Sequence, residues 1–335
     1  MSAPATHPIT SSATRRRSGG RLGRTLLLTL TVLASLQAEP TAAPAPTDTS
    51  FQLGISAEFM QGVSEPDAKA ATKIWAETLA RESGIVAHPE ARLFAGVGEI
   101  VHALRTRQVD VVGMTTAQYL AVTQQVPVAD LFSQDPAGRT TYLILVRNDA
   151  PRSTLADLRG CRLLALHHAH TSMAGIWLDV LLAREHLPGP DQFFGTITPV
   201  SKLSATVLPV FFRKADACLV DRAGFETMAE MNPQIRQQLR ILATSPAINE
   251  GLCCFRADFN SPVKRTILEG IPRFNASLAG QQILTVFQSR RLTPLSEATL
   301  DSARELWAEH ERLLPPAGNG PHPAEGAGGE PARVP

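Results

Sequence analysis

The sequence has few aromatic residues, few cysteines and no long uninterrupted apolar segment. Aromatic residues make up only 5% of the chain, which argues against a sugar-binding groove lined by stacked rings. The longest apolar-leaning run near the N-terminus, Thr25 to Leu36, is short for a membrane span. The motifs C-x-x-C, H-E-x-x-H and G-x-S-x-G are all missing. Common signatures of zinc sites and of serine hydrolases are therefore absent.

The four cysteines are Cys161, Cys218, Cys253 and Cys254. An oxidising compartment permits disulfides, and four cysteines allow three connectivities among which the sequence does not choose. Cys253 and Cys254 are neighbours inside an apolar run, so we expect buried thiols there rather than a metal pair.

The N-terminus has the order of regions found in a secretory signal. A basic segment, Arg15 to Arg24, precedes the apolar run Thr25 to Leu36, and small residues follow. We predict a signal peptide over residues 1–43, cleavage between Glu39 and Asp48, and a periplasmic location. An uncleaved N-terminal anchor is the alternative.

Length and charge exclude some classes of protein. The chain has 335 residues, enough for about two domains. Without residues 1–43, 27 basic and 30 acidic residues remain, which is not the composition of a nucleic-acid-binding protein. Residues 315–335 are rich in Pro, Gly and Ala, and we predict a disordered tail. The folded part is expected between residues 51 and 314.

Short apolar runs alternate with helical patterns through the folded part. A helix is predicted after Ser64, with Asp67 three residues later as in a capping box, and Gly84 is suited to its C-terminal end. Strands that alternate with helices predict an α/β fold with mixed, mostly parallel sheets flanked by helices.

Two segments are predicted to cross between two lobes. They are "RTTYLILVRNDA", residues 139–150, and "RILATSPAINEGLCCFR", residues 240–256. The predicted first lobe is discontinuous and comprises residues 51–140 and 246–314. The predicted second lobe comprises residues 141–245.

The stretch "ALHHAHTSMAGIWLDVLL" contains three histidines, then small and hydroxyl-bearing residues, then a helical pattern. The N–H groups at a helix start and the positive end of the helix dipole favour an anion. Thr171 and Ser172 add hydroxyl donors, and Gly175 permits close approach of the backbone. We therefore predict an oxyanion cradle. The alternative is that Thr171 or Ser172 only caps the helix.

Two other interpretations of the same stretch stay open. His168 and His170 point the same way on an extended segment and are candidate metal ligands, although no further ligand is evident. A nucleophilic Ser172 is a weaker hypothesis, because no accompanying base or nucleophile motif is present.

Five pieces in order resemble a known family. They are "SEPDAKAATKIWAETLA", "VDVVGMTTAQYL", "YLILVRND…STLADLRGCRLL", "HTSMAG" and "VLPVFFRKADACLVDRAGFETM". Together they resemble the phosphate/phosphite/phosphonate-binding family of periplasmic solute-binding proteins of ABC importers. The resemblance implies a type II periplasmic binding protein, two α/β lobes with a two-crossover hinge, and no enzymatic activity. The sequence departs from the family where "HHAHTSMAG" replaces an Asp-Pro-x-Ser-Thr-Ser-Gly turn and where Lys202 replaces a histidine.

The candidate ligand-binding residues come from several predicted strand ends and helix starts. Each has a plainer alternative role, such as a helix cap for Asp221, exposure to solvent for Lys202 and Phe59, and capping or core packing for the residues after the strand "VDVVGM". The full set is Thr171, Ser172, Met173, Ala174, Thr115, Thr116, Tyr119, Lys202, Asp221 and Phe59.

We therefore expect a periplasmic solute-binding protein that captures a small oxyanion, a phosphonate, phosphite or phosphate, for an ABC permease. Lys202 would supply positive charge, and Asp221 would accept a bond from an amine or hydroxyl. The alternative is a sensing module that partners a membrane histidine kinase or other signalling receptor. We expect no cofactor, no metal and no nucleic acid, and a monomer or weak dimer.

Overall fold

The computed structural model describes residues 51–60, 63–85, 91–133, 139–287 and 289–314. The predicted signal peptide and the predicted C-terminal tail lie outside the described residues. Within the described part of the chain, no helix is both long enough and apolar enough to cross a membrane.

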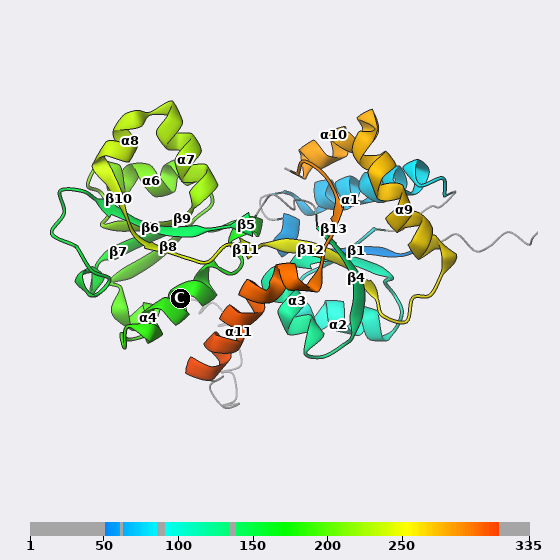
Figure 1. The fold of residues 1–335 in the computed structure, drawn as a ribbon, viewed down its shortest axis with the longest axis horizontal. Helices are drawn as coiled ribbons and strands as arrows, with labels where there is room; N and C mark the ends of the chain where they lie inside the picture. Colours follow the sequence, from blue (N-terminus) through cyan, green and yellow to red (C-terminus); the bar gives the residue numbers. More distant parts are fainter. Residues whose placement is uncertain (1–50, 61–62, 86–90, 134–138, 288, 315–335) are drawn as a thin grey trace, which may run out of the picture. The chain divides into compact units, whose positions relative to one another are not determined.

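The first sheet is mixed and its described strands follow the order β13-β4-β12-β3-β1-β2 (Figure 1). Strand β1 pairs in parallel with β2 and β3, whereas β12 is antiparallel to β3 and β4, and β13 is antiparallel to β4. The bounds are β1 Leu53–Ser56, β2 Ala91–Phe94, β3 Val111–Thr115, β4 Val128–Ser133, β12 Gly251–Arg256 and β13 Thr293–Pro294.

Helices cover both faces of this sheet (Figure 1). Successive side chains of a strand point to opposite faces, so Cys253 packs in one apolar cluster with Trp75, and Cys254 packs in another with Ile100. The elements on the Cys253 side are η1 Glu58–Met60, α1 Glu65–Glu82, α9 Pro262–Ala276 and α10 Leu278–Val286. Those on the Cys254 side are α2 Val97–Arg105 and α3 Thr116–Thr123.

The predicted ends of the first helix are confirmed. The Ser64 hydroxyl accepts the N–H of Asp67 at 3.3 Å and caps α1. Gly84 follows the helix with a φ of +76°, a left-handed conformation that glycine adopts without strain.

The second sheet is also mixed, and its described strands follow the order β10-β6-β9-β7-β8. Strand β7 is parallel to β8 and β9, whereas β6 is antiparallel to β9 and β10. The bounds are β6 Tyr142–Arg147, β7 Arg162–Leu166, β8 Thr196–Val200, β9 Ala217–Asp221 and β10 Leu239–Thr244.

The predicted fold class is confirmed, but parallel pairs are not the majority in these two sheets as described. The physical reason lies in the two crossover strands. Strands β6 and β12 enter their sheets from the other sheet, and each is antiparallel to both of its neighbours.

The helices of the second sheet pack in two groups. Its upper group in Figure 1 builds an apolar cluster around Val207 and Phe225, and its lower group contributes Trp177 and Phe193 to the cluster that also contains Cys254. The upper helices are α6 Leu203–Phe211, α7 Arg222–Met231 and α8 Pro233–Gln238. The lower elements are η2 Ala156–Leu158, η3 Ala169–Thr171, α4 Ala174–Arg184 and α5 Pro190–Phe193.

The two crossover segments pair with each other. Strand β5 (Arg139–Thr140) is antiparallel to β11 (Ile248–Asn249), with Ile248 opposite Thr140. In each crossover a single residue separates the two strands: Thr141 lies between β5 and β6, and Glu250 lies between β11 and β12. Glu250 therefore lies where the chain passes back into the first sheet.

The C-terminal helix α11 (Asp301–Leu313), preceded by η4 (Glu297–Leu300), contacts helices from both sheets. Glu309 accepts two hydrogen bonds from Arg184 of α4, and His310 Nε2 lies 3.0 Å from Asp179 Oδ2. On the other side, Arg304 donates to the Tyr119 hydroxyl of α3. The predicted lobe bounds place α11 in the first lobe, whereas in the structure it also packs on α4.

All four cysteines are free and buried. Burial raises the pKa of the Cys253 thiol to about 12, and it raises the pKa of Cys218 and Cys254 further. The predicted buried thiols at Cys253 and Cys254 are confirmed, and in this structure no disulfide joins the described cysteines.

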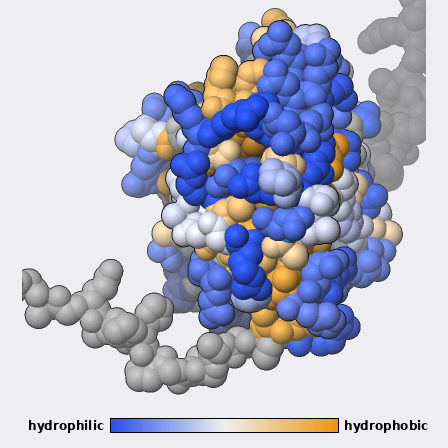
Figure 2. Space-filling view, turned by 90° about the vertical axis from the view of Figure 1, so that its left-hand side faces the viewer, coloured by the Kyte–Doolittle hydropathy of each residue, from blue (hydrophilic) through white to orange (hydrophobic). Residues whose placement is uncertain are grey.

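The polarity of one face of the molecule is visible in Figure 2. Figure 2 shows that this face is mainly hydrophilic, with hydrophobic residues in small separate patches. Scattered apolar residues of this kind are normal for a protein surface.

Candidate ligand-binding site

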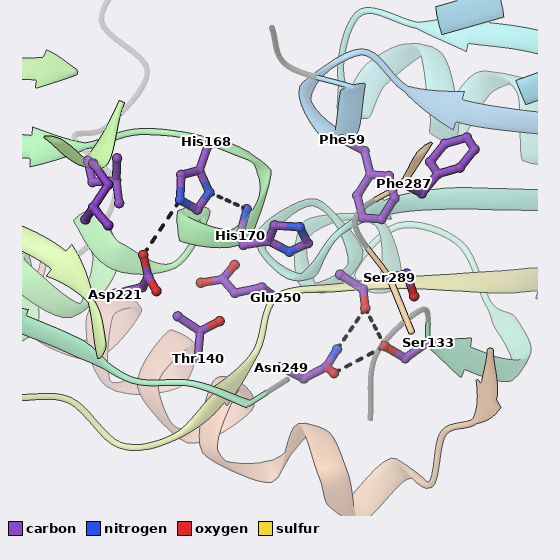
Figure 3. Close-up of a pocket in the computed structure, with 13 residues that line it drawn as sticks. Phe59, Ser133, Thr140, His168, His170, Asp221, Asn249, Glu250, Phe287 and Ser289 are labelled. Atoms are coloured by element: carbon purple, nitrogen blue, oxygen red, sulfur yellow. Dashed lines mark hydrogen bonds and ion pairs between the residues drawn. The ribbon is translucent and has the colours of Figure 1, made fainter. Parts of the chain in front are cut away.

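A cavity of about 380 Å³ lies where the crossover segments meet the edges of the two sheets (Figure 3). Its lining is polar at one end and aromatic at the other, where the rings of Phe59 and Phe287 lie side by side in the figure. The lining residues are Phe59, Ser133, Thr140, Leu166, His168, His170, Leu203, Asp221, Asn249, Glu250, Gly251, Phe287 and Ser289. These described lining residues include no lysine or arginine.

The histidine-rich turn before α4 is held by its own hydrogen bonds. The backbone N–H of His168 donates to Thr171 Oγ1 at 3.0 Å, and the Thr171 hydroxyl donates to the His168 carbonyl at 3.0 Å. His168 Nδ1 accepts the N–H of His170 at 3.1 Å. The hydroxyl of Thr171 thus stabilises the turn, and its proton is used within the turn.

The N–H groups at the start of α4 bind a carboxylate that belongs to the chain itself. Glu250 Oε2 accepts the N–H of Ser172 at 3.0 Å and the Ser172 hydroxyl at 2.6 Å. Glu250 Oε1 accepts the N–H of Met173 at 3.4 Å. Glu250, which lies 78 residues further along the chain than Ser172, therefore takes up the donors for which the sequence predicts an oxyanion.

Glu250 is fixed at both its backbone and its side chain. Its carbonyl accepts the N–H of Thr116 at the start of α3, and only 2% of the residue is exposed. Burial raises the pKa of the Glu250 carboxyl well above its usual range, more than the bonds from Met173 and Ser172 lower it, and the charge of Glu58 raises it further. The site therefore favours a proton on Glu250.

The ring of His168 faces Asp221 across the cavity (Figure 3). Because Nδ1 accepts a hydrogen bond, the proton of the neutral ring is assigned to Nε2, which lies 3.9 Å from Asp221 Oδ2. Burial lowers the pKa of His168, Asp221 opposes that effect, and the neighbouring His170 and His167 add to it. A neutral His168 with an N–H directed toward Asp221 is the result.

Asp221 caps α7 while it lines the cavity. Its Oδ1 accepts the N–H of Gly224 at 2.7 Å, and 18% of its side chain is exposed. Oδ2 lies on the side of His168. The predicted role as a helix cap is therefore present, together with a carboxylate oxygen at the cavity.

Hydroxyl and amide groups from the crossover region complete the polar wall. Ser133 Oγ donates to the Gly251 carbonyl at 3.1 Å, and Asn249 Nδ2 donates to the same oxygen at 3.0 Å. Thr140 and Ser289 also line the cavity. A side chain at Gly251 would clash with the ring of Phe59, so glycine is needed there for the aromatic end to close.

The ten sequence-predicted residues occupy three kinds of position. Phe59 and Asp221 line the cavity, and Ser172 reaches its wall through Glu250. Lys202 is exposed and precedes α6, and it is not among the lining residues. The remaining predicted residues are buried in capping turns or the core, namely Thr171, Met173, Ala174, Thr115, Thr116 and Tyr119.

The residues after β3 illustrate the buried group. Thr115 caps α3 in a complete capping box with Gln118. The Thr116 hydroxyl is buried and has no hydrogen-bond partner in the described structure. Tyr119 belongs to the apolar cluster and accepts from Arg304. We therefore assign these side chains a supporting position behind Glu250.

The sequence did not single out Glu250, Asn249, Ser133, Thr140 or Ser289. A weak signal existed for Glu250, because an acidic residue stands immediately before the apolar run "GLCCFR" inside a predicted crossover. A buried carboxylate needs donors, but the sequence does not say which distant segment supplies them.

No group of three or more potential metal-ligating residues gathers anywhere in the described parts of the chain. His168 and His170 lie at the cavity, but His168 Nδ1 is engaged by the backbone of the turn. The Ser172 hydroxyl donates to Glu250. These contacts of His168 and Ser172 stabilise the turn before α4.

Two mixed sheets, two paired crossovers and a cavity beside them with a polar and an aromatic end define a two-lobed solute-binding protein of type II. The family model described as "ABC transporter, phosphonate, periplasmic substrate-binding protein" matches residues 60–300. The chain therefore belongs to this family of periplasmic substrate-binding proteins of phosphonate-type ABC transporters, which are receptors and not enzymes. No curated protein sequence matches the chain significantly.

Solved structures share the fold at low sequence identity. The binding component of an ABC phosphonate transporter from Pseudomonas aeruginosa is 15% identical, with 79% of this chain and 87% of that chain covered and a TM-score of 0.53. A Xanthomonas citri protein bound to ATP is 18% identical, with coverage of 79% and 98% and a TM-score of 0.58. PhnD1 from Prochlorococcus marinus, in complex with methylphosphonate, is 13% identical, with coverage of 78% and 98% and a TM-score of 0.54.

Proposed function

We propose that this receptor captures a small phosphoryl oxyanion, a phosphonate, phosphite or phosphate, in the cavity beside the crossovers and delivers it to an ABC permease. The observation that carries the proposal is the carboxylate of Glu250 on the N–H groups of Ser172 and Met173. A carboxylate bound there supports the use of the α4 start as an oxyanion cradle, as the dipole and free N–H groups of a helix start predict.

The cavity offers further donors to a phosphoryl group. Hydroxyls of Thr140 and Ser289 line it, and the Nε2–H of His168 lies at its wall. A volume of about 380 Å³ suits a small solute. The methylphosphonate complex of PhnD1, which shares the fold, agrees with a ligand of this class.

Asp221 favours a ligand that brings its own donor. A carboxylate at the cavity repels a plain dianion and accepts a bond from a protonated oxygen or an amine. The described lining residues supply no lysine or arginine to offset it. Protonated phosphite and amino- or hydroxyphosphonates are therefore expected to bind better than sulfate.

Export belongs to the same proposal. A periplasmic receptor must leave the cytoplasm, and residues 1–43 have the features of a signal peptide. N-terminal sequencing of the exported protein should find a start between Glu39 and Asp48. A start at Met1 or Ser2 would contradict cleavage.

A thermal-shift screen tests the ligand class. Purified protein is heated with sulfate, phosphate, phosphite, methylphosphonate, 2-aminoethylphosphonate or dicarboxylates, each with and without a chelator. A ligand at one hundred times its Kd stabilises the folded state by about 2.7 kcal/mol, which shifts the melting temperature measurably. Stabilisation by dicarboxylates alone would overturn the proposal, and stabilisation lost on chelation would revive a histidine–metal site.

A further inference from the structure

The donors at the start of α4 are already in use. In the structure, three hydrogen-bond donors from Ser172 and Met173 converge on one carboxylate, that of Glu250. That carboxylate lines the cavity and the residue is 2% exposed. An oxyanion that binds the same donors must displace it or share them with it.

We propose that Glu250 is the residue that sets the charge selectivity of the cavity, because its carboxylate competes with the ligand oxyanion for the N–H groups of Ser172 and Met173. This inference rests on the proposed oxyanion cradle. The competitor is the Glu250 carboxylate of the protein itself. Its effect is strongest on oxyanions that are fully deprotonated and have no positively charged group.

Charge around Glu250 determines how strong the competition is. Among the described lining residues, Glu250 and Asp221 are the carboxylates and His168 and His170 are the basic groups, and the charge of Glu58 also acts on Glu250. Two like charges in a buried site repel more strongly than they do in water, because the protein interior screens charge less. A dianion beside an ionised Glu250 is therefore strongly disfavoured.

Proton uptake by Glu250 relieves this repulsion. Burial favours the neutral carboxylic acid, and a neutral acid binds the α4 donors less strongly than a carboxylate does. Oxyanion affinity should therefore rise as pH falls. A ligand with an ammonium group depends less on this step, because its positive charge is attracted to the carboxylates.

The Glu250→Gln variant separates charge from shape. Glutamine keeps the size of the side chain and an oxygen that accepts from Ser172, but it has no negative charge. At pH 8 its affinity for inorganic phosphate and methylphosphonate should exceed that of the wild type by about tenfold or more, consistent with removal of a nearby like charge. The gain for 2-aminoethylphosphonate should be smaller. Glu99→Gln, which removes an exposed carboxylate at the start of α2, is the matched control and should change nothing.

Calorimetry at pH 6, 7 and 8 measures how ligand affinity depends on pH. A purely structural role of Glu250 would not change this dependence. Sulfate keeps its charge over this range, so its affinity reports the protein groups. The wild type should bind sulfate more tightly at pH 6 than at pH 8, and Glu250→Gln should lose most of that dependence. His168, whose pKa is lowered by burial, contributes to the dependence that remains.

The possible outcomes distinguish this inference from the proposed function. Unchanged or weaker phosphate and methylphosphonate binding in a folded Glu250→Gln variant overturns the role of Glu250 and leaves the oxyanion receptor intact. Failure of the wild type and of both variants to bind any phosphoryl oxyanion overturns the proposed function itself. If Glu250→Gln fails to fold, the sulfate profile of the wild type decides, because affinity that does not rise at pH 6 contradicts proton-controlled competition.

Discussion

Two helices, α4 and α7, each have a carboxylate bonded to N–H groups at their N-terminal end, but the carboxylates come from different distances along the chain. Asp221 caps α7 from three residues away and keeps 18% of its side chain exposed. Glu250 reaches α4 from 78 residues away and is almost fully buried. A local cap stabilises one helix. The Glu250 carboxylate connects a crossover to the turn before α4, and it bonds to the N–H groups on which we expect the ligand oxyanion.

The difference also appears in the free energy of each arrangement. A partly exposed cap contributes about 1 kcal/mol to stability. A buried carboxylate loses its hydration, and the donors at α4 must offset that loss. For Glu250 the raised pKa indicates that they do not offset it completely. Binding of a ligand or of a proton can therefore weaken the hydrogen bonds from Ser172 and Met173 to Glu250.

The largest expected effect concerns the stability of Glu250→Gln as a function of pH. The pKa of Glu250 is raised on folding, so the folded state holds a proton that the unfolded state has lost. The contribution of Glu250 to wild-type stability should not change with pH below its usual pKa of 4.5, and it should be lost as pH rises from there through the folded pKa, by about 1.4 kcal/mol per pH unit at most. Urea unfolding of both proteins between pH 4.5 and 8 measures the difference, and parallel curves would contradict it.

A smaller effect is expected from Ser172→Ala. It removes the 2.6 Å hydroxyl bond to Glu250, and leaving a buried polar group with one partner fewer costs about 1–3 kcal/mol. Urea unfolding at pH 7.5 should show a loss in this range. In the Glu250→Gln background the same substitution should cost less, since the two residues interact directly. Thr171→Ala, whose hydroxyl bonds only within its own turn, is the comparison, and an equal loss in both backgrounds would show that the pair is not coupled.

Asp221→Ala should have a still smaller effect on stability, about 1 kcal/mol, because it removes a helix cap. Asp221→Asn keeps an oxygen for Gly224 and should restore most of that stability. Both variants should lose the preference for 2-aminoethylphosphonate over methylphosphonate, because neither has the negative charge. Unfolding curves and calorimetry measure the two effects. A preference retained in Asp221→Asn would assign it to another group.

The sequence predicts the local carboxylate but not the distant one. Asp221 ends a recognisable strand and precedes a helix, so both of its predicted roles follow from its neighbours. The start of α4 was likewise recognisable, since "HTSMAG" precedes a helical pattern. Its partner depends on how residues 248–250 cross between the sheets, which is a tertiary arrangement. The same limit explains the sheet directions, because pairing of β6 and β12 with antiparallel neighbours is set by the crossovers and not by local periodicity.

The smallest expected effect is that of Lys202→Ala. Sequence reasoning gave Lys202 the positive charge that holds the ligand, whereas in the structure Lys202 is exposed and only its neighbour Leu203 lines the cavity. An exposed charge outside the cavity is screened by salt over about 8 Å at physiological ionic strength. Oxyanion affinity should therefore change by less than about threefold, and stability by less than about 0.5 kcal/mol. Calorimetry with methylphosphonate at 0.02 and 0.15 M salt tests this, with Lys73→Ala on the exposed side of α1 as the control. A tenfold loss at both salt concentrations, absent from the control, would mean that Lys202 reaches the bound ligand and would restore its predicted role.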